Sequence, residues 1–499
     1  MKKKRGARVL AIGLDAAEPT FVRELIDEGE LPALKRLLEA GRWGRVESPA
    51  AIGSGTVWPT FFTGTEPAEH GIYSDWCWQP HTMRLARFDG NSLVPFWKML
   101  ADEGLAVGVL DVPFAPLVGL SEGFEITEWG AHDLFEGRMK FGPAEIAELV
   151  TAKTAQHPFS LDEGRRRVRH DVVGLKQLGR DCLEGARLRG EFAERLIVST
   201  ETDLSIIIFP EIHHASHMLW HMTERDYPLY TDEQREEAVA IHPGLKEIMR
   251  EVDSQIARLV RAVGDDAEVL VFSLHGMKPA RGLPAFLAHL LEEKGLSCTP
   301  DWSNSSWHER GLSLFASAKR LAPAPLKKLY HRNVPQAVAY RLAQPTMIPA
   351  YDWRRTRAFA LPTDQYGWIR VNLSGRESQG CVALDDYEET CCEIEEMLCS
   401  LSTEDGIPLV RSITRTSKRT EEALNRKLPD MIVDWHDSAF ELPMRIDGLL
   451  LEAHTATQGQ TGQHAPEGFC IWRGVPTSAP ETIKASALHH LIVESLTRN

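Results

Sequence analysis

Short, unbroken apolar runs recur along the chain, and stretches with helical spacing separate them. The runs are Val9–Leu14, Ala106–Val112, Leu204–Phe209 and Glu268–Ser273, and the helical stretches include Phe21–Ala40, Pro95–Glu103 and His242–Val263. An apolar run without alternation is typical of a strand that is buried on both faces, as in a parallel sheet. Strands that alternate with helices indicate an α/β fold with a mostly parallel sheet.

Two stretches interrupt this alternation. Residues 140–200 are helical and charged, and residues 278–350 are mixed and contain several prolines. We expect both to be cap insertions beside the site, within one catalytic domain that spans residues 1–499. Arginines between Arg165 and Arg169 are interpreted as a solvated helix face, with substrate contact as the alternative. Strand signals return at Trp368–Leu373 and Asp430–Asp434.

The formal net charge of the 499 residues is −15. A nucleic-acid-binding protein needs an excess of Lys and Arg to neutralise phosphates, so we expect no nucleic acid partner. A small anionic substrate remains compatible with this charge, because a bound metal ion can reverse the field at a site. No feature of the sequence indicates an oligomeric state.

The chain is predicted to be soluble and cytoplasmic. Lysines open the sequence as in a signal peptide, but the apolar run that follows is too short for one and ends at Asp15. No apolar run approaches the length that spans a membrane, so no membrane association is expected. The eight cysteines form no zinc-binding pair pattern, and their low density fits reduced thiols in the cytosol.

Two residues near the N-terminus are candidates for chemistry. Asp15 ends the first apolar run, where α/β folds place ligand sites, although a helix N-cap is the alternative. Ser54 lies between two glycines, a pattern that lets the backbone approach a ligand closely. A helix that begins near Thr56 would direct its first amides at an anion, and an ordinary turn is the alternative for Ser54.

Histidines follow two other apolar runs. His213 and His217 are four residues apart, which on a helix places both imidazoles on one face for metal binding. His214 and His221 lie nearby and leave a competing assignment open. His275 directly follows the run that ends at Ser273. A further histidine, His464, lies among small and polar residues, as expected of a metal ligand on a loop.

Several segments together resemble the type I phosphodiesterase/nucleotide pyrophosphatase family of the alkaline phosphatase superfamily. They are Ile12–Pro19, Leu31–Leu34, Trp58 with Thr63–Gly64, His70–Ile72, Val109–Pro113, Val371–Arg376 and Pro429–Asp430. The resemblance extends from Val9 to about Gly474. It implies an alkaline phosphatase-like α/β sandwich, with a central, mostly parallel sheet and helices on both faces.

The resemblance also implies roles for individual residues. In that family two divalent metals, usually zinc, flank a nucleophilic Ser or Thr. One metal binds the first Asp, the nucleophile and the Asp and His of an Asp-His-Gly motif, and these positions correspond to Asp15, Ser54, Leu274 and His275. The other binds the Asp and His of an Asp-x3-His motif and a C-terminal His, at the positions of His213, His217 and His464. Thr56 is the alternative nucleophile if the loop is displaced.

This chain departs from the pattern at two ligand positions, where His213 and Leu274 each replace an Asp. Two divalent ions beside the one remaining carboxylate, Asp15, would leave three uncompensated charges, whereas one ion would leave one. Unpaired charge in a buried site is costly. We therefore predict one firmly held metal on His213, His217 and His464. A second position on Asp15, Ser54 and His275 would be weak or empty.

The metal is expected to be divalent, with zinc first and Mn, Fe or Cu as alternatives. A carboxylate from elsewhere, such as Glu211 or Asp111, could restore the second position. The function predicted from the resemblance is a metal-dependent phosphodiesterase or phosphoryl transferase on a small metabolite or nucleotide-like ester. Ser54 would form a covalent intermediate, with His275 as the general base. The alternatives are sulfuryl transfer, a specialised biosynthetic step, or a non-catalytic metal-binding protein.

Overall fold

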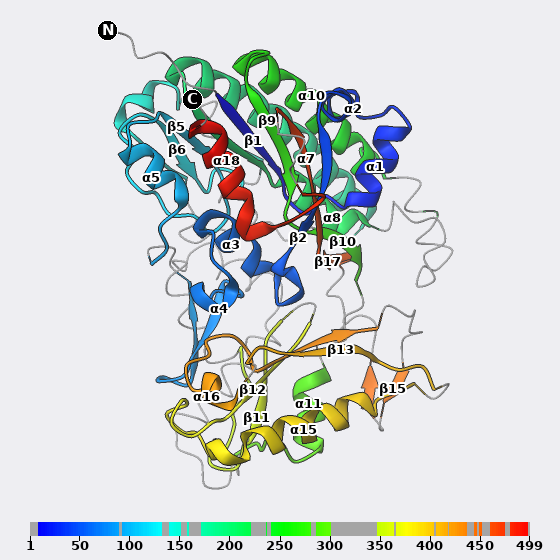
Figure 1. The fold of residues 1–499 in the computed structure, drawn as a ribbon. Coiled ribbons are helices and arrows are strands. Elements are labelled where there is room, and N and C mark those ends of the chain that lie inside the picture. Colours follow the sequence, from blue (N-terminus) through cyan, green and yellow to red (C-terminus); the bar gives the residue numbers. More distant parts are fainter. Residues whose placement is uncertain are drawn as a thin grey trace, which may run out of the picture. The chain divides into compact units, whose positions relative to one another are not determined.

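The computed structural model describes most of the chain as two units (Figure 1). Unit 1 contains Met1–His70, Asp89–Ala280 and Gly459–Asn499, and unit 2 contains Gly71–Phe88 and Arg281–Gln458. The described residues are 8–88, 92–131, 139–150, 157–158, 171–220, 236, 241–280, 286–300, 347–363, 366–403, 406–417, 419–436, 444–446, 449–451, 460–474 and 480–497.

Unit 1 is built around a nine-stranded sheet with the order β19-β2-β18-β9-β1-β8-β5-β6-β7. Its strands are β1 (Val9–Leu14), β2 (Arg42–Glu47), β5 (Val107–Leu110), β6 (Gly123–Thr127), β7 (Lys140–Gly142), β8 (Leu204–Phe209), β9 (Glu268–Ser273), β18 (Glu467–Arg473) and β19 (Thr482–Lys484). The central strands β9, β1, β8, β5 and β6 are parallel, whereas β18 and β7 run antiparallel to their neighbours. The predicted mostly parallel α/β sheet is confirmed.

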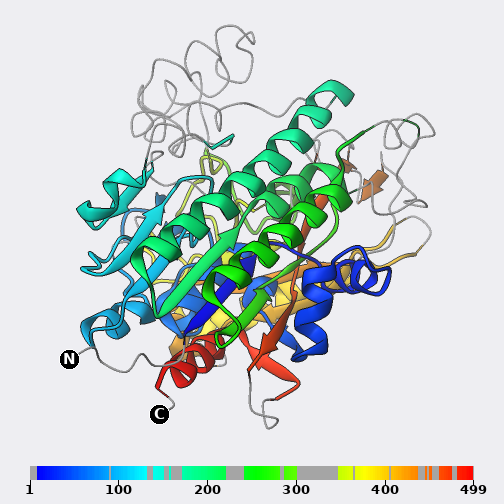
Figure 2. The same cartoon turned by 90° about the horizontal axis from the view of Figure 1, so that it is seen from above.

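The helices of unit 1 cover both faces of this sheet (Figure 2). They are α1 (Pro19–Asp27), α2 (Pro32–Glu39), α3 (Val57–Thr63), α4 (Pro67–His70), α5 (Phe96–Asp102), α7 (Val172–Thr200), α8 (Glu211–Leu219), α10 (Leu245–Val263) and α18 (Leu488–Thr497), with 3-10 turns η1 (Pro49–Ala51), η2 (Ser54–Thr56), η3 (Ala144–Glu148) and η9 (Ala485–Ala487). Helices α7 and α10 pack on one face, and α18 packs against β1 from the other.

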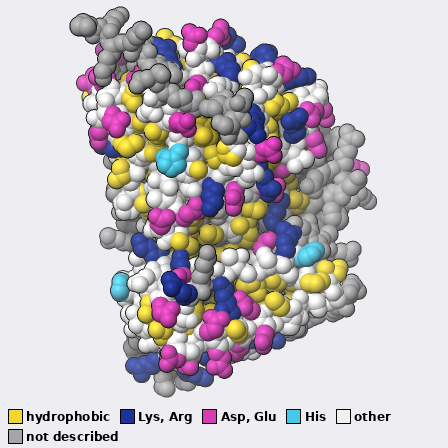
Figure 3. Space-filling view, in the orientation of Figure 1, with side chains coloured by type: hydrophobic (Ala, Val, Ile, Leu, Met, Phe, Trp, Pro, Cys, Tyr) yellow, Lys and Arg dark blue, Asp and Glu magenta, His cyan; other side chains and the backbone are white. Residues whose placement is uncertain are grey.

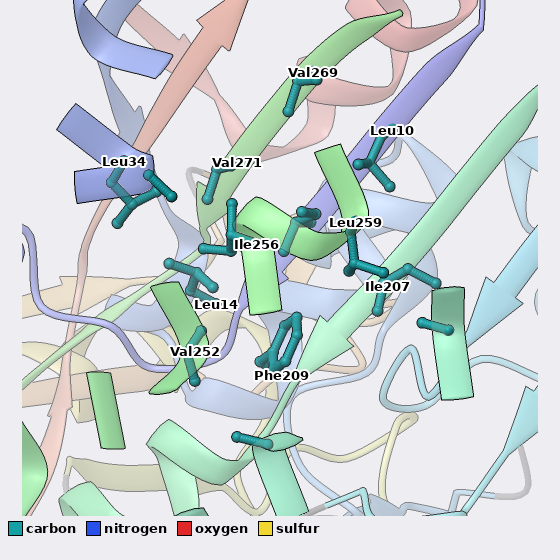
Figure 4. Close-up of a cluster of buried hydrophobic side chains, with 14 of the residues drawn as sticks. Leu10, Leu14, Leu34, Ile207, Phe209, Val252, Ile256, Leu259, Val269 and Val271 are labelled. Atoms are coloured by element: carbon teal, nitrogen blue, oxygen red, sulfur yellow. The ribbon is translucent and has the colours of Figure 1, made fainter. Parts of the chain in front are cut away.

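The core explains why the apolar runs become central strands. Leu10 and Leu14 of β1 and Val271 of β9 meet Ile256 and Leu259 of α10 in one buried cluster (Figure 4). Every residue of β1 and β8 is buried, so neither strand presents a polar face to water. Burial of the apolar side chains on both faces stabilises this arrangement and leaves only the strand ends for polar chemistry.

Unit 2 has its own four-stranded antiparallel sheet with the order β11-β12-β14-β13. Its elements are β3 (Trp76–Gln79), β4 (Arg84–Arg87), β11 (Ala358–Leu361), β12 (Gly367–Val371), β13 (Val410–Arg415), β14 (Met431–Trp435), β15 (Met444–Ile446), β16 (Leu449–Leu451), α11 (Leu287–Glu293), α15 (Tyr387–Cys399), α16 (Thr420–Ala423) and η8 (Leu384–Asp386). Strands β12 and β14 confirm the strands predicted at Trp368–Leu373 and Asp430–Asp434.

A buried ion pair joins two segments of unit 2. Arg376 donates to Asp430 through two nitrogens, at 2.7 and 2.8 Å.

The predicted cap insertions are described only in part. Within 140–200, helix α7 packs against α10 and α8 in the core of unit 1. Most prolines of 278–350 and the arginines of Arg165–Arg169 lie outside the described residues. The cap role of both stretches stays a prediction.

Two properties of the described residues bear on partners. None of their helices is both long and apolar enough to cross a membrane. On the face drawn in Figure 3, acidic and basic side chains are intermixed across the described surface.

Candidate metal centre and active site

The candidate site forms where neighbouring parallel strands of unit 1 end. Asp15 follows β1, Glu211 opens helix α8 just after β8, and His275 follows β9. Strands β8 and β9 flank β1 and run parallel to it, so the three carboxyl ends meet at one edge of the sheet. A further strand, β17 (Gly462–Ala465), pairs with β10 (Gly276–Pro279) and sets His464 opposite Met277 (Figure 1).

Three imidazoles converge at this edge. The Nε2 atom of His213 lies 2.7 Å from Nε2 of His464 and 3.0 Å from Nε2 of His217. One ligand atom from each ring lies within 4.8 Å of the other two, and all three side chains are buried. Three imidazole nitrogens that face a common point are a suitable ligand set for a divalent metal such as zinc. The three residues are called the histidine trio below.

The outer nitrogens of two rings are bound by acceptors. His217 Nδ1 donates to the carbonyl oxygen of Gly462 at 3.0 Å, and His213 Nδ1 donates to Asp15 Oδ2 at 2.7 Å. Because these oxygens only accept hydrogen bonds, the proton of each ring sits on Nδ1, and the lone pair of each Nε2 faces inward. The chemistry of the trio therefore fits a metal ion.

Gly462 permits this packing because it approaches helix α8 closely. A Cβ atom at this position would lie 2.3 Å from the backbone oxygen of Ser216. The backbone amide of Thr461 also donates to the carbonyl oxygen of His217 at 2.8 Å. Strand β17 is thus held against α8 by backbone contacts, and His464 follows two residues later.

Asp15 is the carboxylate of the cluster and is almost fully buried. Its Oδ1 accepts a hydrogen bond from Trp58 Nε1 at 3.1 Å and lies 3.5 Å from His275 Nε2. Burial alone raises the pKa of Asp15, but the imidazoles of His213 and His275 outweigh burial and hold the pKa well below its ordinary value. The side chain is therefore a stable anion in the folded protein.

His275 lies beside the trio but not within it. Its ring centroid is 4.8 Å from that of His464 and 5.6 Å from that of His213. Leu274, at the position where the resemblance implies an Asp, is buried, and its side chain has no oxygen that could bind a metal. The structure thus brings Asp15 and four of the predicted histidines into one cluster.

The two candidate nucleophiles differ in their surroundings. Thr56 is fully buried, and its hydroxyl donates to the carbonyl oxygen of Gly53 at 2.6 Å. Ser54 is half-buried, in η2. Its neighbour η1 contacts β17, and Trp58 just downstream binds Asp15. The Ser54 loop therefore packs against elements that carry the cluster.

Other candidates lie elsewhere. His214 is on α8 but outside the trio, and His221 is outside the described residues. The two carboxylates considered as replacement ligands bind Arg189 instead, Glu211 at 2.8 Å and Asp111 at 2.9 Å. Burial alone raises the pKa of Glu211, but Arg189 and His157 outweigh it and leave the pKa lowered.

Sequence reasoning missed three contributors to this region: the Gly462 carbonyl, the Trp58 indole and the Arg189 guanidinium. Gly462 had a readable signal, since a glycine two residues before a candidate ligand often marks a close backbone approach. Trp58 was recognised only as a family landmark. Arg189 had no signal, because nothing in a long helix pattern distinguishes a buried arginine from an exposed one.

Comparisons with known proteins identify the family and the fold of this chain. The family model for type I phosphodiesterase / nucleotide pyrophosphatase matches residues 9–347, which include every candidate site residue except His464. Comparison with curated protein sequences gives no match. Two structures of phosphonoacetate hydrolase from Sinorhizobium meliloti 1021 are similar in fold. The complex with phosphonoacetate has a TM-score of 0.53 at 15% identity, and the complex with phosphonoformate 0.51 at 15%.

Each of these alignments covers 99% of this chain and 95% of the other. The similarity therefore concerns the whole fold, including the part beyond the family match. Because the matched residues make up more than half of the sequence, the chain belongs to the type I phosphodiesterase/nucleotide pyrophosphatase family, whose members are enzymes that act on phosphate esters.

Proposed function

We propose that this protein is a metal-dependent phosphodiesterase or phosphoryl transferase that acts on a small anionic ester, either a metabolite or a nucleotide-like compound. The observation that carries the proposal is the convergence of three Nε2 atoms in the histidine trio. Family membership supplies the reaction class. The fold similarity to a hydrolase in complex with phosphonoacetate favours a small anionic ligand.

One divalent metal would be held by His213, His217 and His464, with zinc as the first choice and Mn or Fe as alternatives. When bound, it would polarise a phosphoryl oxygen of the substrate as a Lewis acid. The second family position, formed by Asp15, Ser54 and His275, would be weak or empty, because Leu274 supplies no ligand there.

Ser54 would be the nucleophile. Its oxygen would form a bond to phosphorus while the bond from phosphorus to the leaving alcohol breaks. His275 would take the hydroxyl proton and return a proton to the leaving oxygen. Water, or an acceptor alcohol in the case of transfer, would then cleave the phosphoserine and release the product. The half-buried position of Ser54 supports this role over the buried, hydrogen-bonded Thr56.

A second candidate is sulfuryl transfer or a specialised biosynthetic reaction on the same fold. The replacement of two acidic ligands by His213 and Leu274 favours this second candidate, because each change removes one of the negative charges that would balance two divalent metals. A cytoplasmic location stays a prediction from the cysteine content.

The test compares metal-depleted protein with protein reconstituted with Zn²⁺ or Mn²⁺, on bis-p-nitrophenyl phosphate and p-nitrophenyl sulfate. We expect metal-dependent hydrolysis of the phosphodiester. The variant His217→Ala should lose this activity, and His214→Ala, on the same helix but outside the trio, should keep it. Faster hydrolysis of the sulfate would favour the second candidate. Zinc bound tightly with no hydrolysis of either ester would contradict the proposed hydrolysis and would leave a specialised biosynthetic reaction or a non-catalytic protein.

A further inference from the structure

We propose that Asp15 is a positioning residue for His213 and not a metal ligand, so that the centre is a single-metal, three-imidazole site. This inference rests on the proposed metal-dependent function and goes beyond it, since the family resemblance assigns Asp15 to the metal directly.

The nitrogens of His213 face opposite partners. Nδ1 lies 2.7 Å from Asp15 Oδ2, whereas Nε2 lies 2.7 Å from the nitrogen of His464 and 3.0 Å from that of His217. An imidazole that binds a metal through one nitrogen characteristically donates its other N–H to a carboxylate or carbonyl. Asp15 and the metal position therefore occupy opposite edges of one ring.

The remaining oxygen of Asp15 also has partners. Oδ1 accepts from Trp58 Nε1 at 3.1 Å and faces His275 Nε2 at 3.5 Å. The buried carboxylate is thus held by rings from three segments of the chain. Among the described residues, the group of ligand atoms that lie within 4.8 Å of one another contains the trio and no carboxylate.

The two histidines of α8 are anchored in parallel ways. Gly462 offers a neutral carbonyl to His217 Nδ1, and Asp15 offers an anionic oxygen to His213 Nδ1. Both contacts fix the tautomer and the orientation of a ring before any metal arrives.

The sequence departures account for the change in role. The resemblance implies an aspartate at position 213. Such an aspartate would have no proton to donate to Asp15, and the two neighbouring carboxylates would repel each other unless a metal ion lay between them. The imidazole of His213 supplies that proton and takes over Asp15 Oδ2. Leu274 removes the other carboxylate, so the second-metal position loses its anionic ligands.

The test uses Co²⁺ in place of the native metal in the wild type, Asp15→Asn and His217→Ala. We expect one bound ion per wild-type chain by elemental analysis. Asp15→Asn should keep one ion and the same visible cobalt bands, while its Kd in a chelator competition weakens about 10- to 100-fold. His217→Ala, which removes a ligand, should change the bands themselves.

Trp58→Phe is the matched control. It removes the hydrogen bond to Oδ1 but leaves Oδ2 facing His213, so its Kd should change less than that of Asp15→Asn. Two ions per wild-type chain with one in Asp15→Asn, or altered cobalt bands in Asp15→Asn, would overturn the inference. None of these readouts needs turnover, so an inactive protein with the predicted cobalt spectrum would refute the proposed function and leave the role of Asp15 standing.

Discussion

Arg189 donates its Nε–H to Glu211 Oε1 at 2.8 Å, and both side chains are completely buried. Its Nη1 donates to Asp111 Oδ2 at 2.9 Å. Glu211 is the first residue of α8, the helix that carries His213 and His217 two and six residues later. The arginine of α7 therefore fixes the start of the ligand helix to the end of β5.

We predict that Arg189→Met destabilises the protein by about 3–5 kcal/mol, because it leaves two carboxylates buried without their cation. Urea denaturation of metal-free protein measures this difference. Arg187→Met is the control, since Arg187 lies on the same helix but pairs with Glu184 and Glu191 at the surface, and its loss should cost under about 1 kcal/mol. Equal costs for the two variants would contradict the assigned role of Arg189.

A second prediction concerns the nucleophile. Ser54→Ala should reduce phosphodiester turnover by at least about 1,000-fold, because the variant lacks the oxygen that would bond to phosphorus. Thr56→Val should keep turnover and cost about 0.5–1.5 kcal/mol of stability, the value of one hydrogen bond to Gly53. Steady-state rates and urea unfolding of both variants distinguish the two residues. Loss of turnover in Thr56→Val at normal stability would make Thr56 the nucleophile.

The sequence predicted the parts of the fold that depend on local pattern. β1, β8 and β9 appear as unbroken apolar runs because parallel central strands are buried on both faces, and this placed Asp15 and His275 at strand ends. The pairing of β17 with β10 was not predicted. It joins two short segments that contain glycines, and such a contact depends on backbone approach, which leaves no periodic signal.

A similar limit applies to the candidate site. The four-residue spacing of His213 and His217 predicted that they share a face of α8, and the structure shows their Nε2 atoms 3.0 Å apart. The direction of each ring could not be predicted, because it depends on acceptors 198 and 245 residues away in the sequence. The role proposed for Asp15 follows from the direction of the His213 ring, whose Nδ1 faces Asp15, and could not be read from the sequence around Asp15.

The third prediction is a pH dependence of stability. Burial is the largest effect on His157 and, with Arg189, lowers the pKa of its imidazole from the ordinary value of 6.5, although Glu211 and Asp111 act in the opposite direction. In the unfolded chain this ring gains a proton as the pH falls through about 6.5, while the folded protein keeps it neutral to lower pH. The unfolded state then binds more protons, so the free energy of unfolding falls below pH 6.5.

His157→Gln should therefore make stability less dependent on pH between about 6.5 and 5. The amide can still donate to Glu211 but does not titrate, and one histidine contributes at most about 1.4 kcal/mol per pH unit. Urea unfolding of metal-free wild type and variant at several pH values in this range gives the two slopes. Parallel slopes would show that His157 is protonated equally in both states.

The fourth prediction tests the contact that brings His464 to α8. Gly462→Ala would place a Cβ atom 2.3 Å from the carbonyl oxygen of Ser216, and a backbone atom in a helix cannot move aside as a side-chain end can. Strand β17 must then shift away from α8, which lengthens the 3.0 Å contact between Gly462 O and His217 Nδ1 and draws His464 from the trio. We expect a loss of about 1–3 kcal/mol in stability and a metal Kd weakened about 10- to 100-fold.

Calorimetric metal titration and urea unfolding of Gly462→Ala measure both effects. Gly142→Ala in β7 is the control, because an added Cβ there meets no atom of the described residues within 4 Å, and it should bind metal as the wild type does. The metal result is the decisive one. If Gly462→Ala loses stability but binds metal with unchanged affinity, the contact between β17 and α8 does not determine the position of His464. The imidazole of His464 would then be positioned by contacts other than those with α8.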